Sequence, residues 1–164
     1  MNKNRKAIYP GTFDPITRGH LDIIERSSKL FDEVVVVIMD NPDKTCLFNE
    51  EERLDMIKDA CKNINNVHCC IGSGLSVDFA TKCEAQVLIR GIRAVQDYEY
   101  ELQTATANMW LNDQIETLFL LSKPNYSFLS SSSVKVIAQH NADVTKFVSD
   151  YVKEKLINKY NKNL

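Results

Sequence analysis

The run Val34-Val35-Val36-Val37-Ile38 constrains the fold of this 164-residue chain more than any other segment. Consecutive β-branched residues favour an extended strand, because their side chains fit a pleated surface better than a helix. Both faces of such a strand are apolar, which is typical of a parallel sheet covered on both sides. The segment therefore predicts an α/β fold built around a buried parallel sheet.

Strand-like runs alternate with helical patterns along the rest of the chain. The other strand candidates are residues 7–9, 67–71, 86–89 and 117–121, and the helix candidates are residues 20–30, 50–63, 75–83, 97–112, 131–140 and 144–158. Asn49 followed by Glu52 indicates a capping box at the start of the second helix. The alternation predicts a single-domain, doubly wound, Rossmann-like parallel sheet of five strands, with helices on both faces and a C-terminal helical segment. Because no linker, repeat or shift in composition divides the chain, we expect residues 1–164 to form one domain.

The composition excludes several classes of protein. The net charge of −2 gives no reason to expect nucleic acid or an anionic membrane as a partner. The basic start of the chain lacks the apolar stretch of a secretory signal, and no apolar run approaches the roughly 18 residues of a membrane span. The five cysteines form no Cys-x-x-Cys pair. We therefore expect a cytoplasmic protein with reduced thiols and no metal held by protein ligands.

The segment from Tyr9 to His20 predicts an anion-binding site. It follows the first strand, breaks at Pro10-Gly11 and leads into a helix that begins near Gly19-His20. In α/β sheets such a loop lies at the carboxyl end of a strand, where the amides and dipole of the helix N-terminus bind phosphate. His20 lies in the first turn, so its imidazole can face the same anion. The alternative interpretation is that Gly-His only begins and caps the helix.

Three cations follow two further strands. Lys44 lies in a turn-forming loop, residues 41–45, from which it can reach over the edge of the sheet; the alternative is a solvated loop lysine. Arg90 ends a strand, Gly91 permits an unusual backbone turn, and Arg93 lies near the start of the next helix. Two arginines so spaced suit a bidentate grip on phosphate. The competing interpretation is salt bridging to acidic residues of that helix, namely Asp97, Glu99 and Glu101.

Residues 125–135 combine aromatic side chains with a serine run, Ser130–Ser133, that opens a helical pattern. Hydroxyl groups and unpaired amides at a helix N-terminus form a cradle for phosphate. Taken alone, a serine run would indicate a flexible loop or a helix cap. The aromatic residues before it and the apolar helical pattern after it favour an ordered phosphate site.

These segments resemble the motifs of one enzyme family. Thr17-Arg18-Gly19-His20 resembles the His-x-Gly-His signature of nucleotidyltransferases, with Thr17 at the position of the first histidine. This variant lies beside Pro10-Gly11-Thr12-Phe13-Asp14-Pro15. Together with Ile-Arg-Gly-Ile-Arg-Ala-Val (residues 89–95) and Tyr-Ser-Phe-Leu-Ser-Ser-Ser (residues 126–132), it resembles bacterial phosphopantetheine adenylyltransferases. The motifs follow the family's order and spacing between residues 9 and 135.

The resemblance implies transfer of the adenylyl group of ATP to 4′-phosphopantetheine, giving dephospho-coenzyme A and pyrophosphate in coenzyme A biosynthesis. It implies direct in-line attack with no covalent enzyme intermediate. Because the attacking phosphate is already ionised, no strong base is needed, and catalysis comes from alignment and charge neutralisation. We expect Mg²⁺ to be bound through the ATP phosphates. ATP and 4′-phosphopantetheine are the expected partners, and the resemblance implies a homohexamer.

The resemblance also implies roles for individual residues. The expected catalytic residues are His20, Thr12, Lys44 and Arg90, and the expected phosphopantetheine ligands are Thr12, Lys44, Ser76 and Arg90. The expected ATP ligands are Thr12, Phe13, His20, Gly91, Ile92, Arg93, Glu101, Tyr126, Ser127, Phe128, Leu129, Ser130, Ser131 and Ser132. Ser76 departs from the family pattern, in which this position is often bulkier and apolar.

Other functions are possible on such a fold. Gly72-Ser73-Gly74 after a strand prompts an NAD-binding redox protein, but the fingerprint lacks its third glycine and does not follow the first strand. A non-catalytic nucleotide-binding module would bind ATP without releasing pyrophosphate. Sister transferases adenylate nicotinamide mononucleotide or cytidylate glycerol phosphate. Arg90–Arg93 and Tyr98–Glu101 favour the pantetheine branch.

Overall fold

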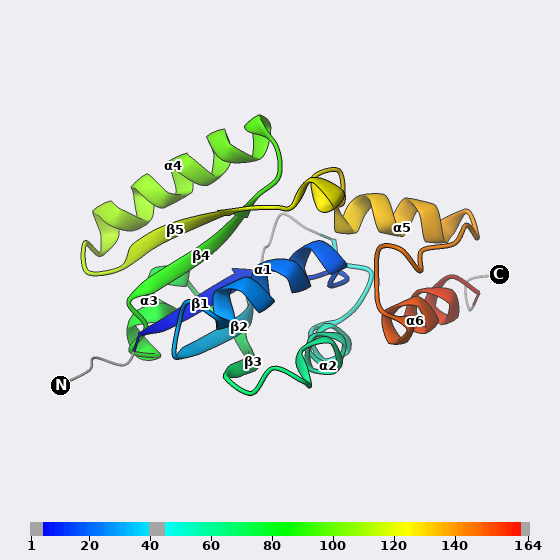
Figure 1. Ribbon diagram of the computed structural model, residues 1–164, viewed down its shortest axis with the longest axis horizontal. Coiled ribbons are helices and arrows are strands. Elements are labelled where there is room, and N and C mark those ends of the chain that lie inside the picture. The colour runs from blue at the N-terminus through cyan, green and yellow to red at the C-terminus, as the bar shows by residue number, and fades with distance from the viewer. Residues whose placement is uncertain (1–4, 40–44, 162–164) are drawn as a thin grey trace.

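The computed structural model describes residues 5–39 and 45–161, without the side chains of Val95 and Gln96. Its centre is a sheet of parallel strands in the order β3-β2-β1-β4-β5 (Figure 1). The strands are β1 (Lys6–Gly11), β2 (Glu33–Met39), β3 (Val67–Gly72), β4 (Val87–Ile92) and β5 (Glu116–Leu121). The predicted α/β class and the five-stranded parallel sheet are confirmed.

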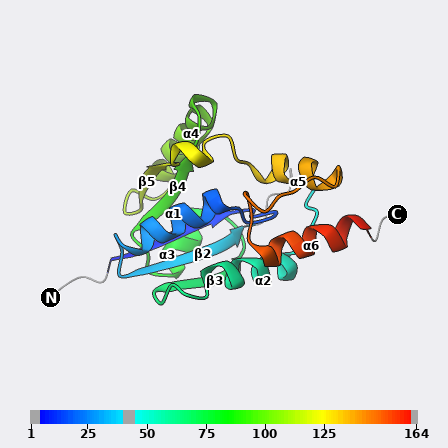
Figure 2. The same cartoon turned by 45° about the vertical axis from the view of Figure 1, so that its right-hand side comes forward.

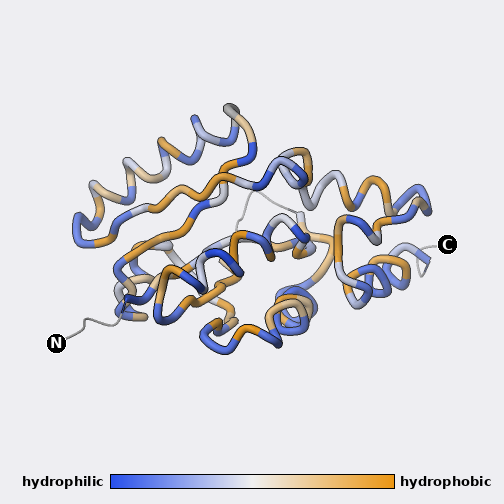
Figure 3. Tube along the Cα trace, viewed as in Figure 1, coloured by the Kyte–Doolittle hydropathy of each residue, from blue (hydrophilic) through white to orange (hydrophobic). Residues whose placement is uncertain are grey.

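Strand β2 shows why the sheet is buried on both faces. Val34, Val36 and Ile38 pack into one core cluster, whereas Val35 and Val37 pack into the other. This division follows the alternation of side chains along a strand. All five side chains are buried. In Figure 3 the strands are mostly apolar, while the helices mix polar and apolar residues.

Helices cover the two faces of the sheet. α1 (Arg18–Ser28) and α2 (Glu50–Cys61) pack into the first cluster, and α3 (Ser76–Lys82) packs into the second. α4 (Val95–Leu111) lies along β4 and β5 (Figure 1). The predicted capping box of α2 is confirmed, since Asn49 and Glu52 exchange hydrogen bonds with each other's amides.

After β5 the chain forms a short 3-10 turn, η1 (Pro124–Tyr126), and two helices, α5 (Ser131–Gln139) and α6 (Asp150–Asn161). Both helices lie beyond one end of the sheet in the two views (Figures 1 and 2). Within residues 5–39 and 45–161, none of the helices has the length and apolar character needed to cross a membrane.

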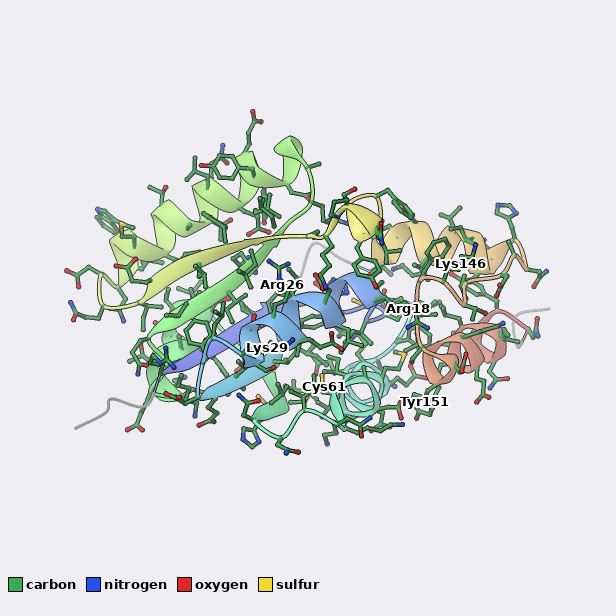
Figure 4. All side chains as sticks on the ribbon, viewed as in Figure 1. Arg18, Arg26, Lys29, Cys61, Lys146 and Tyr151 are labelled. Carbon is green, nitrogen blue, oxygen red and sulfur yellow. The ribbon has the colours of Figure 1, made fainter. Side chains whose placement is uncertain are left out.

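The last helix begins at Asp150 rather than at residue 144, so its predicted start is wrong. Residues 145–147 form a turn that bonds to the start of α1. The Arg18 amide donates to the Phe147 carbonyl over 2.8 Å, and the Arg18 guanidinium donates to the Thr145 carbonyl over 3.3 Å. Arg18 is labelled at this junction in Figure 4. Because these carbonyls bond to another element, the segment does not continue the helix.

The predicted backbone turn at Gly91 is also wrong. β4 continues through Ile92, and Gly91 pairs with Leu120 of β5 in regular register. A Cβ on Gly91 would lie 3.5 Å from Ile23 and from the Tyr9 hydroxyl, which is ordinary contact. The chain therefore leaves the strand only after Ile92, immediately before Arg93.

Candidate active site

The order of the strands changes direction between β1 and β4, and a cavity lies at this point. β2 and β3 are added on one side of β1, and β4 and β5 on the other. Sheets of this kind bind ligands outside the carboxyl ends of the strands at such a switch point. The cavity has a volume of about 930 Å³. It is lined by the loop after β1, the end of β4 and the starts of α1 and α5.

The structure brings most of the predicted site residues into this cavity. Those that line it are Thr12, Phe13, His20, Ser76, Arg90, Gly91, Arg93, Glu101, Leu129, Ser130, Ser131 and Ser132. Lys44 lies outside the described residues. Four predicted residues do not line it, namely Ile92, Tyr126, Ser127 and Phe128. Ile92 is buried, and Phe128 is 65% exposed and packs edge-to-face on Phe147.

His20 is held in one orientation by the start of α1. The Thr17 amide donates to His20 Nδ1 over 3.1 Å, and the His20 amide donates to Thr17 Oγ1 over 3.4 Å, which forms a reciprocal capping box. The capping role considered from the sequence is therefore confirmed. Because Nδ1 accepts a hydrogen bond from a backbone amide, the proton of the neutral ring lies on Nε2. The cap thus determines which ring nitrogen can donate.

Phe13 packs between Tyr9 and His20. Its ring centroid lies 5.4 Å from that of Tyr9 and 5.2 Å from that of His20, both edge-to-face. Phe13 has a φ of 50°, in the left-handed region that few non-glycine residues adopt. Its ring covers Gly11, where a Cβ would lie 2.8 Å from ring atoms. The absence of a side chain at Gly11 therefore lets the Phe13 ring lie where it contacts the imidazole.

Arg90 is fixed by a two-point ion pair with Glu101 of α4. Nε and Nη2 of Arg90 donate to the carboxylate over 2.5 and 2.7 Å, and Nη1 donates to the Pro10 carbonyl over 3.2 Å. Burial alone would lower the pKa of Arg90, but the hydrogen bonds and charge of Glu101 outweigh burial and hold that pKa above its ordinary value. Arg90 therefore keeps a fixed positive charge at the cavity.

Arg93 is held in a similar way. Nε and Nη2 donate to the Asp97 carboxylate over 3.0 and 3.2 Å, and Nη1 donates to the Leu129 carbonyl over 2.9 Å. Salt bridging, the competing interpretation of the two arginines, is thus confirmed for Asp97 and Glu101. A guanidinium has donors beyond those used in these bonds. Both arginines are therefore held in place and still able to bind an anion.

The serine run contains a cap and a cavity lining. Ser130 is the N-cap of α5, and its hydroxyl accepts from the Ser133 amide over 3.0 Å. Ser131 donates to the Pro15 carbonyl over 2.8 Å, which fastens α5 to the loop after β1. Ser132 is exposed and lines the cavity. The predicted helix N-terminus is therefore confirmed, and it faces the cavity.

Sequence reasoning missed three charged residues around this loop. Asp14 and Lys135 line the cavity and form an ion pair with a separation of 2.6 Å. Arg53 is buried in α2, and its Nη1 donates to the Thr12 carbonyl over 2.7 Å. Asp14 and Lys135 both lie within the segments that pointed to the site, and Lys135 is one helical turn after Ser131. That spacing was the available signal for Lys135.

The cavity presents cations and hydroxyl groups. The carboxylates among its described lining residues are all ion-paired: Asp14 with Lys135, Asp97 with Arg93 and Glu101 with Arg90. In the part of the chain that the structure describes, no group of three or more His, Cys, Asp and Glu side chains is arranged to hold a metal ion. Fixed cations and hydroxyl donors are the groups that bind phosphate oxygens.

Comparison with known proteins identifies the class. A cytidylyltransferase-like family model matches residues 8–137, so the chain belongs to this class of nucleotidyltransferases. The phosphopantetheine adenylyltransferases of Dictyoglomus turgidum and Finegoldia magna are 50% and 48% identical to this chain. The matches cover 94% and 98% of the chain and 97% and 99% of those relatives. The chain belongs to the phosphopantetheine adenylyltransferase family, which confirms the resemblance in its motifs.

Solved structures agree on the fold. Plasmodium falciparum nicotinic acid mononucleotide adenylyltransferase complexed with NaAD has a TM-score of 0.70 at 17% identity, over 97% of each chain. The same enzyme complexed with APC has a TM-score of 0.65 at 16% identity, over 97% of this chain and 96% of that one. At such identities the likeness concerns the fold alone.

Proposed function

We propose that this chain transfers the adenylyl group of ATP to 4′-phosphopantetheine, giving dephospho-coenzyme A and pyrophosphate. The observation that supports this most is the meeting of His20, Arg90 and the N-terminus of α5 in one cavity at the switch point of the sheet. Arg90 suits the acceptor phosphate, His20 suits the α-phosphate, and the N-terminus of α5 suits the leaving pyrophosphate. The close relatives are named for the same reaction.

The acceptor phosphate is proposed to bind Thr12, Lys44 and Arg90, with the pantetheine arm directed toward Ser76 at the start of α3. Arg90 is held ready by its ion pair. The backbone at Thr12 is held by Arg53, which donates to its carbonyl. These fixed partners support a site that needs little rearrangement to align the attacking oxygen.

ATP is proposed to bind Phe13, His20, Gly91, Arg93 and residues 129–132, which line the cavity. Glu101 was expected among these ligands. Both of its carboxylate oxygens accept hydrogen bonds from Arg90. We therefore propose that Glu101 contributes mainly by orienting Arg90.

Adenylyl transfer is proposed to proceed by in-line attack of the acceptor phosphate on the α-phosphorus, without a protein nucleophile. The attacking oxygen is already anionic, so no side chain has to remove a proton. His20 would donate a hydrogen bond from Nε2 to an α-phosphate oxygen as charge develops there. Arg93 and the start of α5 would neutralise the leaving pyrophosphate.

Magnesium is proposed to arrive with ATP. A hard cation of this kind prefers oxygen ligands and is commonly bound through substrate phosphates. The lining carboxylates of the described cavity already bond to cations, which fits a metal held by ATP rather than by the protein. The ion would reduce the negative charge that the acceptor phosphate has to approach.

The proposal includes a homo-oligomer, with the hexamer that the family resemblance implies. Exposed apolar side chains along α4 support it: Leu102, Met109, Trp110 and Leu111, with Trp110 88% exposed. Large exposed apolar surfaces commonly mark protein contacts. Light scattering during size exclusion is expected to give a mass of six chains, and a monomer mass would contradict this part of the proposal. Because the reaction consumes ATP, we expect it to take place in the cytoplasm.

Replacing Ser132 by alanine is expected to weaken the binding of ATP by about 1 kcal/mol, roughly fivefold, while leaving the affinity for AMP unchanged. The reason is that AMP lacks the β- and γ-phosphates proposed to lie at the start of α5. Calorimetric titration with both nucleotides measures the difference. Ser149→Ala is the matched control, because its hydroxyl accepts from the Val152 amide at the start of α6 and does not line the cavity. It is expected to lower stability by roughly 0.5–2 kcal/mol without changing the ATP-to-AMP preference. If Ser132→Ala kept the wild-type preference for ATP over AMP, Ser132 would not be a ligand of the outer phosphates.

The proposed activity is tested by pyrophosphate release from ATP with different acceptors. Release is expected with 4′-phosphopantetheine and not with nicotinamide mononucleotide. CTP with glycerol phosphate tests the second sister reaction. Faster pyrophosphate release with either of these acceptors would mean that the chain catalyses that sister reaction instead. ATP binding without release for any acceptor would favour the non-catalytic module.

A further inference from the structure

Asp14 is a buried carboxylate that holds together three sides of the cavity. It is 4% exposed. Oδ1 accepts from the Phe48 amide over 2.9 Å, and Oδ2 accepts from the Leu47 amide over 2.9 Å. Oδ2 also accepts from Lys135 Nζ over 2.6 Å. One side chain thus bonds the loop after β1 to the segment before α2 and to α5.

A carboxylate matches this set of partners. Two amides and an ammonium group are all donors, and a carboxylate has acceptor sites but no hydrogen to donate. A buried charge is costly unless it is paired and hydrogen-bonded, and Asp14 is both. The arrangement is therefore specific to Asp14 and Lys135 rather than a chance contact of surface charges.

The ion pair lies between the two halves of the proposed reaction. Asp14 directly follows Thr12 and Phe13, which are proposed to contact the attacking phosphate and ATP. Lys135 lies one turn into α5, whose first turn is proposed to hold the leaving pyrophosphate. Ser131 bonds to the Pro15 carbonyl, so two bonds link α5 to this loop. Their common effect is to set the separation between the loop and the helix N-terminus.

We propose that Asp14 and Lys135 are positioning residues for adenylyl transfer. This role rests on the proposed function, because in-line displacement requires the attacking and leaving groups to be held at one separation. A displacement of about 1 Å can lower a rate by about 100-fold. Loss of the ion pair is expected to lower kcat more than it weakens the binding of ATP, since each side of the cavity keeps its own phosphate-binding groups.

The test replaces Lys135 and a matched lysine. Lys135→Met is expected to lower kcat for pyrophosphate release by about 10-fold to 100-fold, with a much smaller change in the dissociation constant of ATP. Lys135→Arg, which can still pair with Asp14, is expected to recover most of kcat. The control is Lys159→Met, which removes an ion pair of 2.8 Å between α6 and Glu52 of α2 and does not line the cavity. It is expected to retain the wild-type kcat.

Each result has one meaning. Wild-type kcat in Lys135→Met would overturn the positioning role while leaving the proposed function intact. Equal losses in Lys135→Met and Lys159→Met would overturn it as well, since the effect would then be general destabilisation. Weakened ATP binding with normal kcat would make Lys135 a direct ATP ligand instead. A wild-type chain that releases no pyrophosphate with any acceptor would overturn the proposed function, and this role with it.

Discussion

His20→Ala is expected to lower kcat more than 100-fold, while ATP binds nearly as before. This fall corresponds to a loss of about 3–4 kcal/mol of transition-state stabilisation. The capping box gives the Nε2 hydrogen a fixed direction, and charge grows on the α-phosphate only as the acceptor attacks. An interaction made chiefly in the transition state appears in kcat rather than in ground-state affinity. Steady-state kinetics and calorimetry measure the two quantities separately.

His20→Gln separates the chemical role from the structural one. Glutamine at the third position of a helix can complete a capping box with Thr17 but has no imidazole. Its stability to urea is therefore expected to stay close to that of the wild type, while its kcat falls as in His20→Ala. A normal kcat in either variant, with only a raised Michaelis constant for ATP, would remove His20 from the chemistry.

Arg90→Met is expected to weaken the binding of 4′-phosphopantetheine by about 2–5 kcal/mol and the binding of ATP by much less. Part of this loss reflects Glu101, which would be left partly buried without its partner. Arg93→Met is expected to show the reverse preference, because Arg93 joins α4 to the segment before α5. Titrations at constant ionic strength are needed, since phosphate contacts depend on salt.

The double variant Arg90→Met/Glu101→Gln controls for the stranded carboxylate. It removes both charges of the pair and is expected to recover stability relative to Arg90→Met alone. Its affinity for 4′-phosphopantetheine is expected to remain low. If the double variant bound the acceptor as the wild type does, Arg90 would be a structural partner of Glu101 and not a phosphate ligand.

The elements whose signals are local could be predicted from the sequence. The alternation along Val34–Ile38 is a property of one strand, and the capping box of Asn49 and Glu52 is a property of one helix start. Both were found in the structure at the expected residues. The cavity followed from topology, because parallel strands bring their carboxyl ends to one edge of the sheet.

What could not be predicted depends on contacts between distant segments. Residues 144–149 have apolar spacing typical of a helix, yet they bond to Arg18, far away in the chain. Asp14 and Lys135 are separated by 121 residues, and no local pattern indicates that they meet. The ion pair of Arg90 with Glu101 was one of several considered, and only the packing of α4 on β4 selected it.

Direct adenylyl transfer to 4′-phosphopantetheine can be followed in a single-turnover experiment. ATP labelled at the α-phosphate is mixed with excess protein, magnesium and 4′-phosphopantetheine, and the reaction is quenched at intervals. The label is expected to pass from ATP into dephospho-coenzyme A with an equal amount of pyrophosphate and no labelled protein. Label that ends in AMP, stays in ATP or becomes attached to the protein would contradict direct transfer to 4′-phosphopantetheine.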